Sequence, residues 1–154
     1  MKTKGRKARQ APLSIGWREW VTLPELCGYR IKAKVDTGAR TSAIHAWNIR
    51  PENRDGVTWV RFDLHPNQRD NRLVVTCNCP VFDRRVITNS GGVRQRRYIV
   101  KTILRMGNRE WPIQLSLANR DTMGFRMLIG RAALRQKTLI DPAASFLAGA
   151  QALR

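Results

Sequence analysis

Acidic residues are scarce in this sequence. Its 154 residues include 11 Asp and Glu against 29 Lys and Arg, which gives a formal net charge of +18 at pH 7. Five of the basic residues fall within residues 1–10, so a basic tail alone does not account for the charge. A field of this sign attracts polyanions, and the candidates are nucleic acid, a ribosome surface, anionic lipid and acidic peptides.

Long apolar runs and disulfide spacings are also missing. No stretch approaches the roughly 18 apolar residues of a membrane-spanning helix, and residues 1–10 are polar and basic with no apolar segment behind them. The three cysteines, Cys27, Cys77 and Cys79, are an odd number, and the closest pair is separated by one residue, which suits a disulfide poorly. We therefore expect a soluble cytoplasmic protein with reduced thiols and no membrane partner.

Cofactor motifs are absent as well. The chain contains neither a G-x-x-x-x-G-K-S/T phosphate loop nor an H-E-x-x-H pair. Cys77, Cys79, His45 and His65 number four but lack the spacing of a zinc knuckle. We predict no metal site and no cofactor. His45 is expected to pack behind the loop that follows residue 35, and His65 to lie in a loop of its own.

Hydrophobic residues alternate with polar ones through most of the chain. This pattern predicts strands over residues 15–23, 29–35, 57–64, 73–76, 81–87, 97–106, 109–118 and 127–129. Short strands at this spacing predict an all-β closed barrel over residues 13–142, with a single short helix near its end, over residues 132–138. Residues 1–12 are predicted to be a disordered basic arm. Residues 143–154 form a C-terminal segment, either a closing helix or an interface segment.

One motif points to a catalytic residue. Asp36-Thr37-Gly38-Ala39 follows the predicted strand 29–35, and a D-T-G-A after an apolar strand is how aspartic proteases present their catalytic carboxylate. The same residue types are ordinary in turns, so the motif alone leaves a plain turn as the alternative. The segments further along the chain decide between the two.

Residues 127–134, Met-Leu-Ile-Gly-Arg-Ala-Ala-Leu, are predicted to form a short buried strand that runs through Gly-Arg into a helix. With the D-T-G-A motif and the intervening hairpins, this segment resembles the retropepsins. The longer string Lys-Val-Asp-Thr-Gly-Ala-Arg-Thr-Ser-Ala at residues 34–43 resembles the RimK-associated family, also called "ATP-dependent zinc" proteases. The resemblance covers residues 30–134 and implies a retropepsin-like fold and aspartic peptidase activity.

Such an activity requires two carboxylates that share one proton. The chain offers one D-T-G, because the nearest candidate for a second, at residues 121–124, is interrupted by Met123. The resemblance therefore implies a homodimer in which paired Asp36 side chains activate a water. It assigns Thr37 to hydrogen bonds across the dimer and Gly38 to close approach of its N–H to the carboxylate.

The resemblance also implies the substrate-binding residues. They are Ala39, Arg40 and Thr41 beside the catalytic turn, and Ser90, Gly91, Gly92 and Arg97 on a flap hairpin that closes over the substrate. Arg40 stands where viral retropepsins have an acid that pairs with the later arginine, here Arg131. The two arginines then need a carboxylate from Asp121, Glu25, Asp141 or the substrate. Arg40 either binds a substrate carboxylate or forms an internal salt bridge.

RimK-type ligases add glutamates to protein C-termini, so the resemblance implies a peptidase that trims acidic, glutamate-rich tails, with a ribosomal protein among the candidate partners. A noncatalytic basic adaptor with the same fold, bound to ribosome or nucleic acid, is the first alternative. The second is a peptidase of general specificity, in which the arginines matter only to solubility. Because the chain contains no nucleic-acid recognition motif, nucleic-acid binding is expected to be nonspecific.

Overall fold

The computed structural model describes residues 10–68, 70–89, 91–119 and 124–152. Strands dominate it, as the alternating pattern predicted. The elements in chain order are β1 (Leu13–Ile15), β2 (Arg18–Leu23), β3 (Cys27–Asp36), β4 (Ser42–His45), β5 (Trp47–Arg54), β6 (Val57–Leu64), β7 (Val75–Pro80), β8 (Asp83–Thr88), β9 (Arg94–Met106), β10 (Arg109–Ala118), β11 (Met127–Gly130), α1 (Arg131–Leu134), β12 (Thr138–Ile140) and α2 (Leu147–Ala152). Of the predicted arm, only residues 10–12 are described, and Ser90 and Asp121 also lie outside the described residues.

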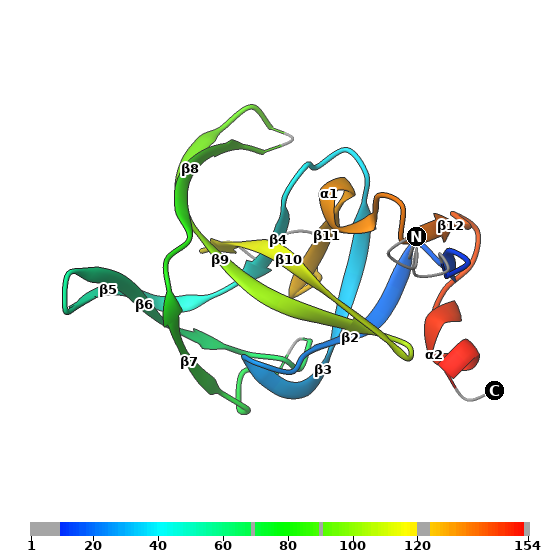
Figure 1. Ribbon diagram of the computed structural model, residues 1–154, viewed down its shortest axis with the longest axis horizontal. Coiled ribbons are helices and arrows are strands. Elements are labelled where there is room, and N and C mark those ends of the chain that lie inside the picture. The colour runs from blue at the N-terminus through cyan, green and yellow to red at the C-terminus, as the bar shows by residue number, and fades with distance from the viewer. Residues whose placement is uncertain (1–9, 69, 90, 120–123, 153–154) are drawn as a thin grey trace, which may run out of the picture.

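The main sheet closes on itself. Its seven strands are paired in the order β10-β4-β11-β3-β2-β9-β8, and β9 also pairs with β10 through the tight turn at Gly107 and Asn108. The strands from β10 round to β9 therefore form a ring, and β8 continues beyond it as an edge strand (Figure 1). A three-stranded sheet of β5, β6 and β7 projects from one side of the ring, while β1 pairs in parallel with β12 near both chain ends.

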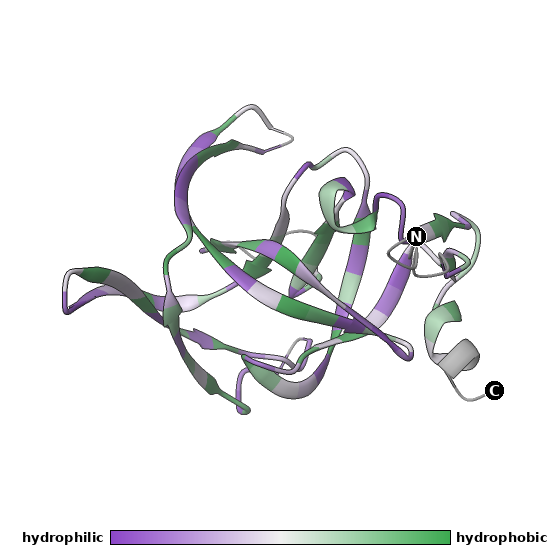
Figure 2. Cartoon of the chain, viewed as in Figure 1, coloured by the Kyte–Doolittle hydropathy of each residue, from purple (hydrophilic) through white to green (hydrophobic). Residues whose placement is uncertain are grey.

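The core fills the ring because every second residue of its strands points inward. Figure 2 shows the resulting alternation of hydrophobic and hydrophilic residues along the strands. The largest completely buried side chains include Ile31, Phe62, Leu104, Leu115 and Met127. No helix among the described residues is long and apolar enough to cross a membrane.

One charged residue, Glu19, lies on the buried face of β2 with none of its surface exposed. Its carboxylate accepts hydrogen bonds from the backbone N–H groups of Gly16 at 2.7 Å, Leu147 at 2.8 Å and Ala148 at 3.0 Å. The last two belong to the first turn of α2. A buried carboxylate is therefore satisfied by backbone donors, and it attaches the C-terminal helix to the ring.

Asp63 plays a similar part in the projecting sheet. It lies on the middle strand, β6, and accepts hydrogen bonds from Asn48 Nδ2 and Thr76 Oγ1, both at 2.8 Å. These hydrogen bonds, that of Asn48 first, lower the pKa of Asp63 below its ordinary value. The carboxylate thus links the segments on both sides of its own strand.

The structure differs from the predictions in several places. β4, β5 and β12 were not predicted, although β4 lies in the main ring between β10 and β11. The strand predicted over residues 15–23 is divided into β1 and β2, and β7 covers Val75–Pro80 where residues 73–76 were predicted. The helix predicted over residues 132–138 ends at Leu134, because Gln136 adopts a positive φ of 65° and Thr138 begins β12, which pairs with β1.

Candidate active site

The D-T-G-A motif lies in the loop between β3 and β4. These two strands are not neighbours in the sheet, because β11 lies between them. The loop of residues 37–41, which we call the catalytic loop because it follows the predicted catalytic residue Asp36, must therefore cross over the carboxyl end of β11, where Gly130 pairs with Asp36. A Cβ at Gly130 would lie 2.7 Å from the Thr41 carbonyl carbon and 2.9 Å from the Arg40 oxygen. The close approach of the crossing loop leaves no room for a side chain at residue 130, which explains the glycine of the Gly-Arg motif.

Asp36 is the last residue of β3, and its side chain is half-buried. Its Oδ1 accepts a hydrogen bond from the Gly38 N–H at 3.0 Å. A Cβ at Gly38 would lie 3.2 Å from that same oxygen, which is tighter than most such contacts. Thr37 and Gly38 are exposed, so the carboxylate is held by a turn whose outer surface is open to a partner.

Arg131 supports this turn from beneath. Its Nη1 donates to the carbonyl oxygens of Thr37 at 3.4 Å and Gly38 at 3.1 Å. The backbone N–H of Arg131 donates to Ala39 O at 2.8 Å, and that of Ala132 donates to Arg40 O at 3.0 Å. The beginning of α1 thus satisfies four successive carbonyls of the loop.

Arg40 and Arg131 form no ion pair with a carboxylate in the described part of the chain. Among the described residues, neither Glu25 nor Asp141 forms an ion pair with Arg40 or Arg131, and Asp121 is not described. Arg131 uses backbone carbonyls instead. Arg40 is exposed at the edge of the site.

The predicted flap is the hairpin between β8 and β9, which rises on the same side of the ring as the catalytic loop (Figure 1). Asn89 organises its tip: its Oδ1 accepts hydrogen bonds from the N–H groups of Gly91 and Val93, both at 3.0 Å. Gly92 has a φ of 80°, a conformation in which glycine is favoured.

A cleft of about 510 Å³ separates the catalytic loop from β8. Its lining includes the predicted binding residues Ala39, Arg40 and Thr41, but not Gly91, Gly92 or Arg97. The lining residues are Gly38, Ala39, Arg40, Thr41, Arg85, Val86, Ile87, Thr88 and Arg131. Arg97 is 9% exposed, and its Nε donates to Gln95 at 3.1 Å.

Sequence reasoning missed Arg85, which faces the catalytic loop across the cleft. It lies directly opposite Arg97 in the ladder between β8 and β9. The alternation along β8 was the signal that could have found it, since residues 85 and 87 share one face of a strand.

The cysteines and histidines are not arranged as a second reactive centre. Burial raises the pKa of the Cys77 thiol to about 12 and that of Cys79 to about 11, so both remain protonated at neutral pH. His45 and His65 each stack on Trp47, with ring centroids 3.7 and 3.8 Å away. Within the described ranges, no three His, Cys, Asp or Glu side chains gather as metal ligands.

Comparison with known proteins identifies a family whose model matches most of the chain. The family model described as "RimB-like: Retropepsin-like aspartic endopeptidase RimB" matches residues 14–151. A protein of Shewanella halifaxensis named "Probable alpha-L-glutamate ligase" is 48% identical over 137 residues, and one of the same name from Desulfotalea psychrophila is 50% identical over 129 residues.

These two matches cover 89% and 84% of this chain but 30% and 28% of the relatives. The chain thus spans less than a third of the length of the curated relatives that it matches. Among solved structures, a Legionella pneumophila protein of unknown function superposes with a TM-score of 0.72 over 90% of this chain and 99% of that one, at 22% identity. That similarity shows a shared fold.

Proposed function

Because the chain belongs to the RimB-like family of retropepsin-like aspartic endopeptidases, we propose that it is one half of a dimeric aspartic peptidase. The observation that carries the proposal is that the Asp36 carboxylate accepts a hydrogen bond from Gly38, the first of the residues that line the cleft, in a turn that Arg131 and the start of α1 support. A single carboxylate cannot act as both acid and base in one step. A second copy would supply the other.

In the proposed dimer, the two Asp36 carboxyls share one proton and titrate as a unit. The ionised carboxyl takes a proton from a bound water, and the water oxygen attacks the scissile carbonyl carbon. The protonated carboxyl meanwhile donates its hydrogen bond to the carbonyl oxygen. The carboxyl that took the proton from the water then gives it to the amide nitrogen, and the C–N bond breaks. Thr37, which is exposed, would hydrogen-bond across the dimer beneath the pair.

We propose that the substrate is an acidic, glutamate-rich protein tail, such as that of a ribosomal protein, in the cytoplasm. Curated relatives that contain a segment like this chain are named glutamate ligases, and a peptidase joined to a ligase fits opposing reactions on one substrate. The net charge of +18 favours an acidic substrate. Arg40 lies in the cleft with no ion pair to any described carboxylate, and its planar guanidinium suits a substrate carboxylate.

The test uses wild type and Asp36→Asn, which keeps the shape of the side chain and an acceptor for the Gly38 N–H. Each is incubated with a protein that bears a C-terminal glutamate tail, and the products are read by intact mass. We expect successive losses of glutamate residues with wild type alone. A glutamine-tailed protein is the matched control for substrate charge. Equal cleavage by Asp36→Asn would contradict the assignment of Asp36.

The dimer is tested separately by sedimentation across a concentration series, with activity measured in parallel. We expect specific activity to fall as the dimer dissociates. A monomeric species with full activity would contradict the shared site, because each monomer contains one D-T-G motif.

The high positive charge also favours a second candidate, a noncatalytic basic adaptor bound to ribosome or nucleic acid. Such binding would weaken steeply with salt. It would be indifferent to Asp36→Asn. Ribosome binding measured with both proteins across a salt series distinguishes it from the peptidase.

A further inference from the structure

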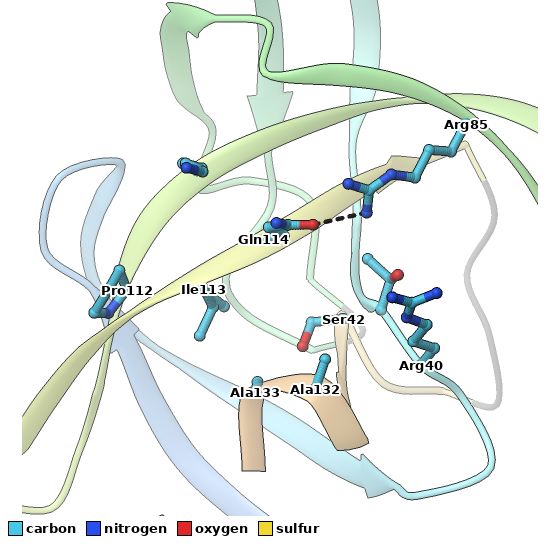
Figure 3. Close-up of a pocket in the computed structure, with 10 residues that line it drawn as sticks. Arg40, Ser42, Arg85, Pro112, Ile113, Gln114, Ala132 and Ala133 are labelled. Carbon is cyan, nitrogen blue, oxygen red and sulfur yellow. Dashed lines mark hydrogen bonds between the residues drawn. The ribbon is translucent and has the colours of Figure 1, made fainter. Parts of the chain in front are cut away.

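A second pocket of about 400 Å³ adjoins the cleft, and we call it the Arg85 pocket. Arg40, Thr41 and Arg85 line both, so a chain bound in the cleft can place a side chain in this pocket. The pocket extends from β8 to the start of α1. Figure 3 shows Arg85 and Gln114 above the first residues of α1, with Arg40 at one side.

The Arg85 guanidinium is fixed in orientation. Its Nε donates to Asp83 Oδ2 and its Nη1 donates to Gln114 Oε1, both at 2.7 Å (Figure 3 draws the second bond). These two bonds restrain the plane of the group and leave Nη2 without a hydrogen bond among the described residues. A restrained guanidinium with a remaining donor edge is suited to a carboxylate, since little freedom is lost on binding.

Charge accumulates around this group. Lys101 and Arg40 also line the pocket, and none of its described lining residues is acidic. Arg97 lies directly opposite Arg85 on β9, although like charges in that relation destabilise a sheet. Asp83, which accepts a hydrogen bond from Arg85 Nε and does not line the pocket, offsets one positive charge. The excess that remains is positive.

The other wall of the pocket is apolar. Ile113 and Pro112 from β10 and Ala132 and Ala133 from α1 line it. Cationic donors on one side and small apolar side chains on the other fit a carboxylate on a short aliphatic stem. A glutamate side chain has that chemistry.

We infer that the Arg85 pocket is a specificity subsite in which Arg85 binds the side-chain carboxylate of a substrate glutamate near the scissile bond. The inference rests on the proposed function, because it assigns a substrate side chain to a pocket beside the cleft that residues 38–41 line. Arg85 contacts the substrate and takes no part in bond cleavage.

Binding tests the inference without hydrolysis. In the Asp36→Asn chain, the affinity for a fluorescent hexaglutamate peptide is measured by anisotropy at fixed ionic strength, beside a peptide with glutamine in place of glutamate. Arg85→Gln is the test variant. Arg84→Gln is the matched control: it removes the same charge from the next residue, whose guanidinium lies over the Tyr98 ring at 5.1 Å from the centroid.

We expect Arg85→Gln to weaken hexaglutamate binding about 10- to 100-fold, as for the loss of a charge-assisted hydrogen bond, and Arg84→Gln to weaken it less than about threefold. Arg85→Lys keeps the charge without the planar fork and should fall between them. A second arm compares kcat/KM on glutamate and glutamine tails in the active chain. There Arg85→Gln should abolish the preference for glutamate.

The outcomes separate the two proposals. If Arg85 controls hexaglutamate binding but wild type hydrolyses nothing, the subsite stands and the peptidase proposal fails. If wild type prefers glutamate tails and Arg85→Gln keeps that preference, the subsite is overturned alone. Equal losses in Arg85→Gln and Arg84→Gln would also overturn it, because the effect would then come from overall charge. Absence of hexaglutamate binding and of cleavage overturns both.

Discussion

Gly130→Ala tests whether the crossing of the catalytic loop over β11 sets the geometry of the site. An alanine Cβ would lie 2.7 Å from Thr41 C, 2.9 Å from Arg40 O and 3.0 Å from Ala39 O. All three atoms belong to the backbone, so no side chain can rotate away. The loop must retreat by about 0.4–0.7 Å to restore an ordinary contact of 3.4 Å.

Two effects follow from that shift. Overpacking of this kind costs about 1–3 kcal/mol of unfolding free energy. The retreat also stretches the hydrogen bonds from α1 to the loop, which are 2.8 and 3.0 Å long in the native chain. Because a misplacement of about 1 Å can cost about 100-fold in rate, we expect kcat on a glutamate-tailed protein to fall roughly 10- to 100-fold.

Gly28→Ala is the matched control, since Gly28 lies on β3, the strand that ends in Asp36, and a Cβ there would meet nothing within 4 Å. Urea unfolding and hydrolysis are measured for both variants beside wild type. Gly28→Ala should stay within about 0.5 kcal/mol of wild type and keep its rate. Wild-type stability and rate in Gly130→Ala would refute the argument that contact with the loop requires glycine at this position.

Two further predictions concern carboxylates outside the cleft. Glu19→Gln should lower the unfolding free energy by about 2–3 kcal/mol, because the side-chain amide of glutamine cannot accept all three backbone hydrogen bonds. Hydrogen exchange of the backbone amides should become faster first in α2. Unchanged exchange in α2 would contradict the proposal that Glu19 attaches this helix to the ring. Asp63→Asn should lower the urea midpoint at pH 7. Since the folded-state pKa of Asp63 is lowered, its contribution is present above the unfolded value of about 3.9 and is lost as the pH falls through the folded value. The two midpoints should therefore converge in acid, and a constant gap would contradict this.

The fold was predictable because its evidence is local. Period-two alternation reports which face of a strand is buried, and it placed Glu19 in phase with Val21 and Leu23 on that face. The partners of Glu19 could not be predicted in the same way. Leu147 and Ala148 are 128 and 129 residues away along the chain, and only the closed ring brings α2 to β2.

The elements that were missed are set by tertiary contacts. β4 is four residues long, and its place between β10 and β11 depends on pairing from both sides. β5 contains Pro51, and Asn48 near its start adopts a positive φ of 52°, so the segment lacks a regular alternation. The helix predicted over residues 132–138 is shorter in the structure, because Thr138 begins β12, which pairs with β1.

The site was predictable in part for a similar reason. The position of Asp36 follows from a contiguous motif, whereas the choice among several arginines around the flap depends on direction and burial. Arg97 was predicted to bind substrate, and it lies mostly buried beside Gln95. Arg85, on the facing strand, lines the cleft. Charge alone does not distinguish the two arginines, and the alternation along β8 was the one signal in the sequence that favoured Arg85.

The hydrogen bonds from Arg131 and α1 to the catalytic loop are all made on one side of it, and this leaves the other side available to a second copy of the chain. The carbonyls of residues 37–40 all accept hydrogen bonds from Arg131 or the start of α1, so they point toward the body of the protein. Thr37 and Gly38 remain exposed on the other side of the turn, next to the half-buried Asp36. A turn fixed on its inner side presents its carboxylate without needing to rearrange when a partner arrives. Pairing of two such turns would then place two preorganised acids together, and the ordering that the active site needs would already be complete in each monomer.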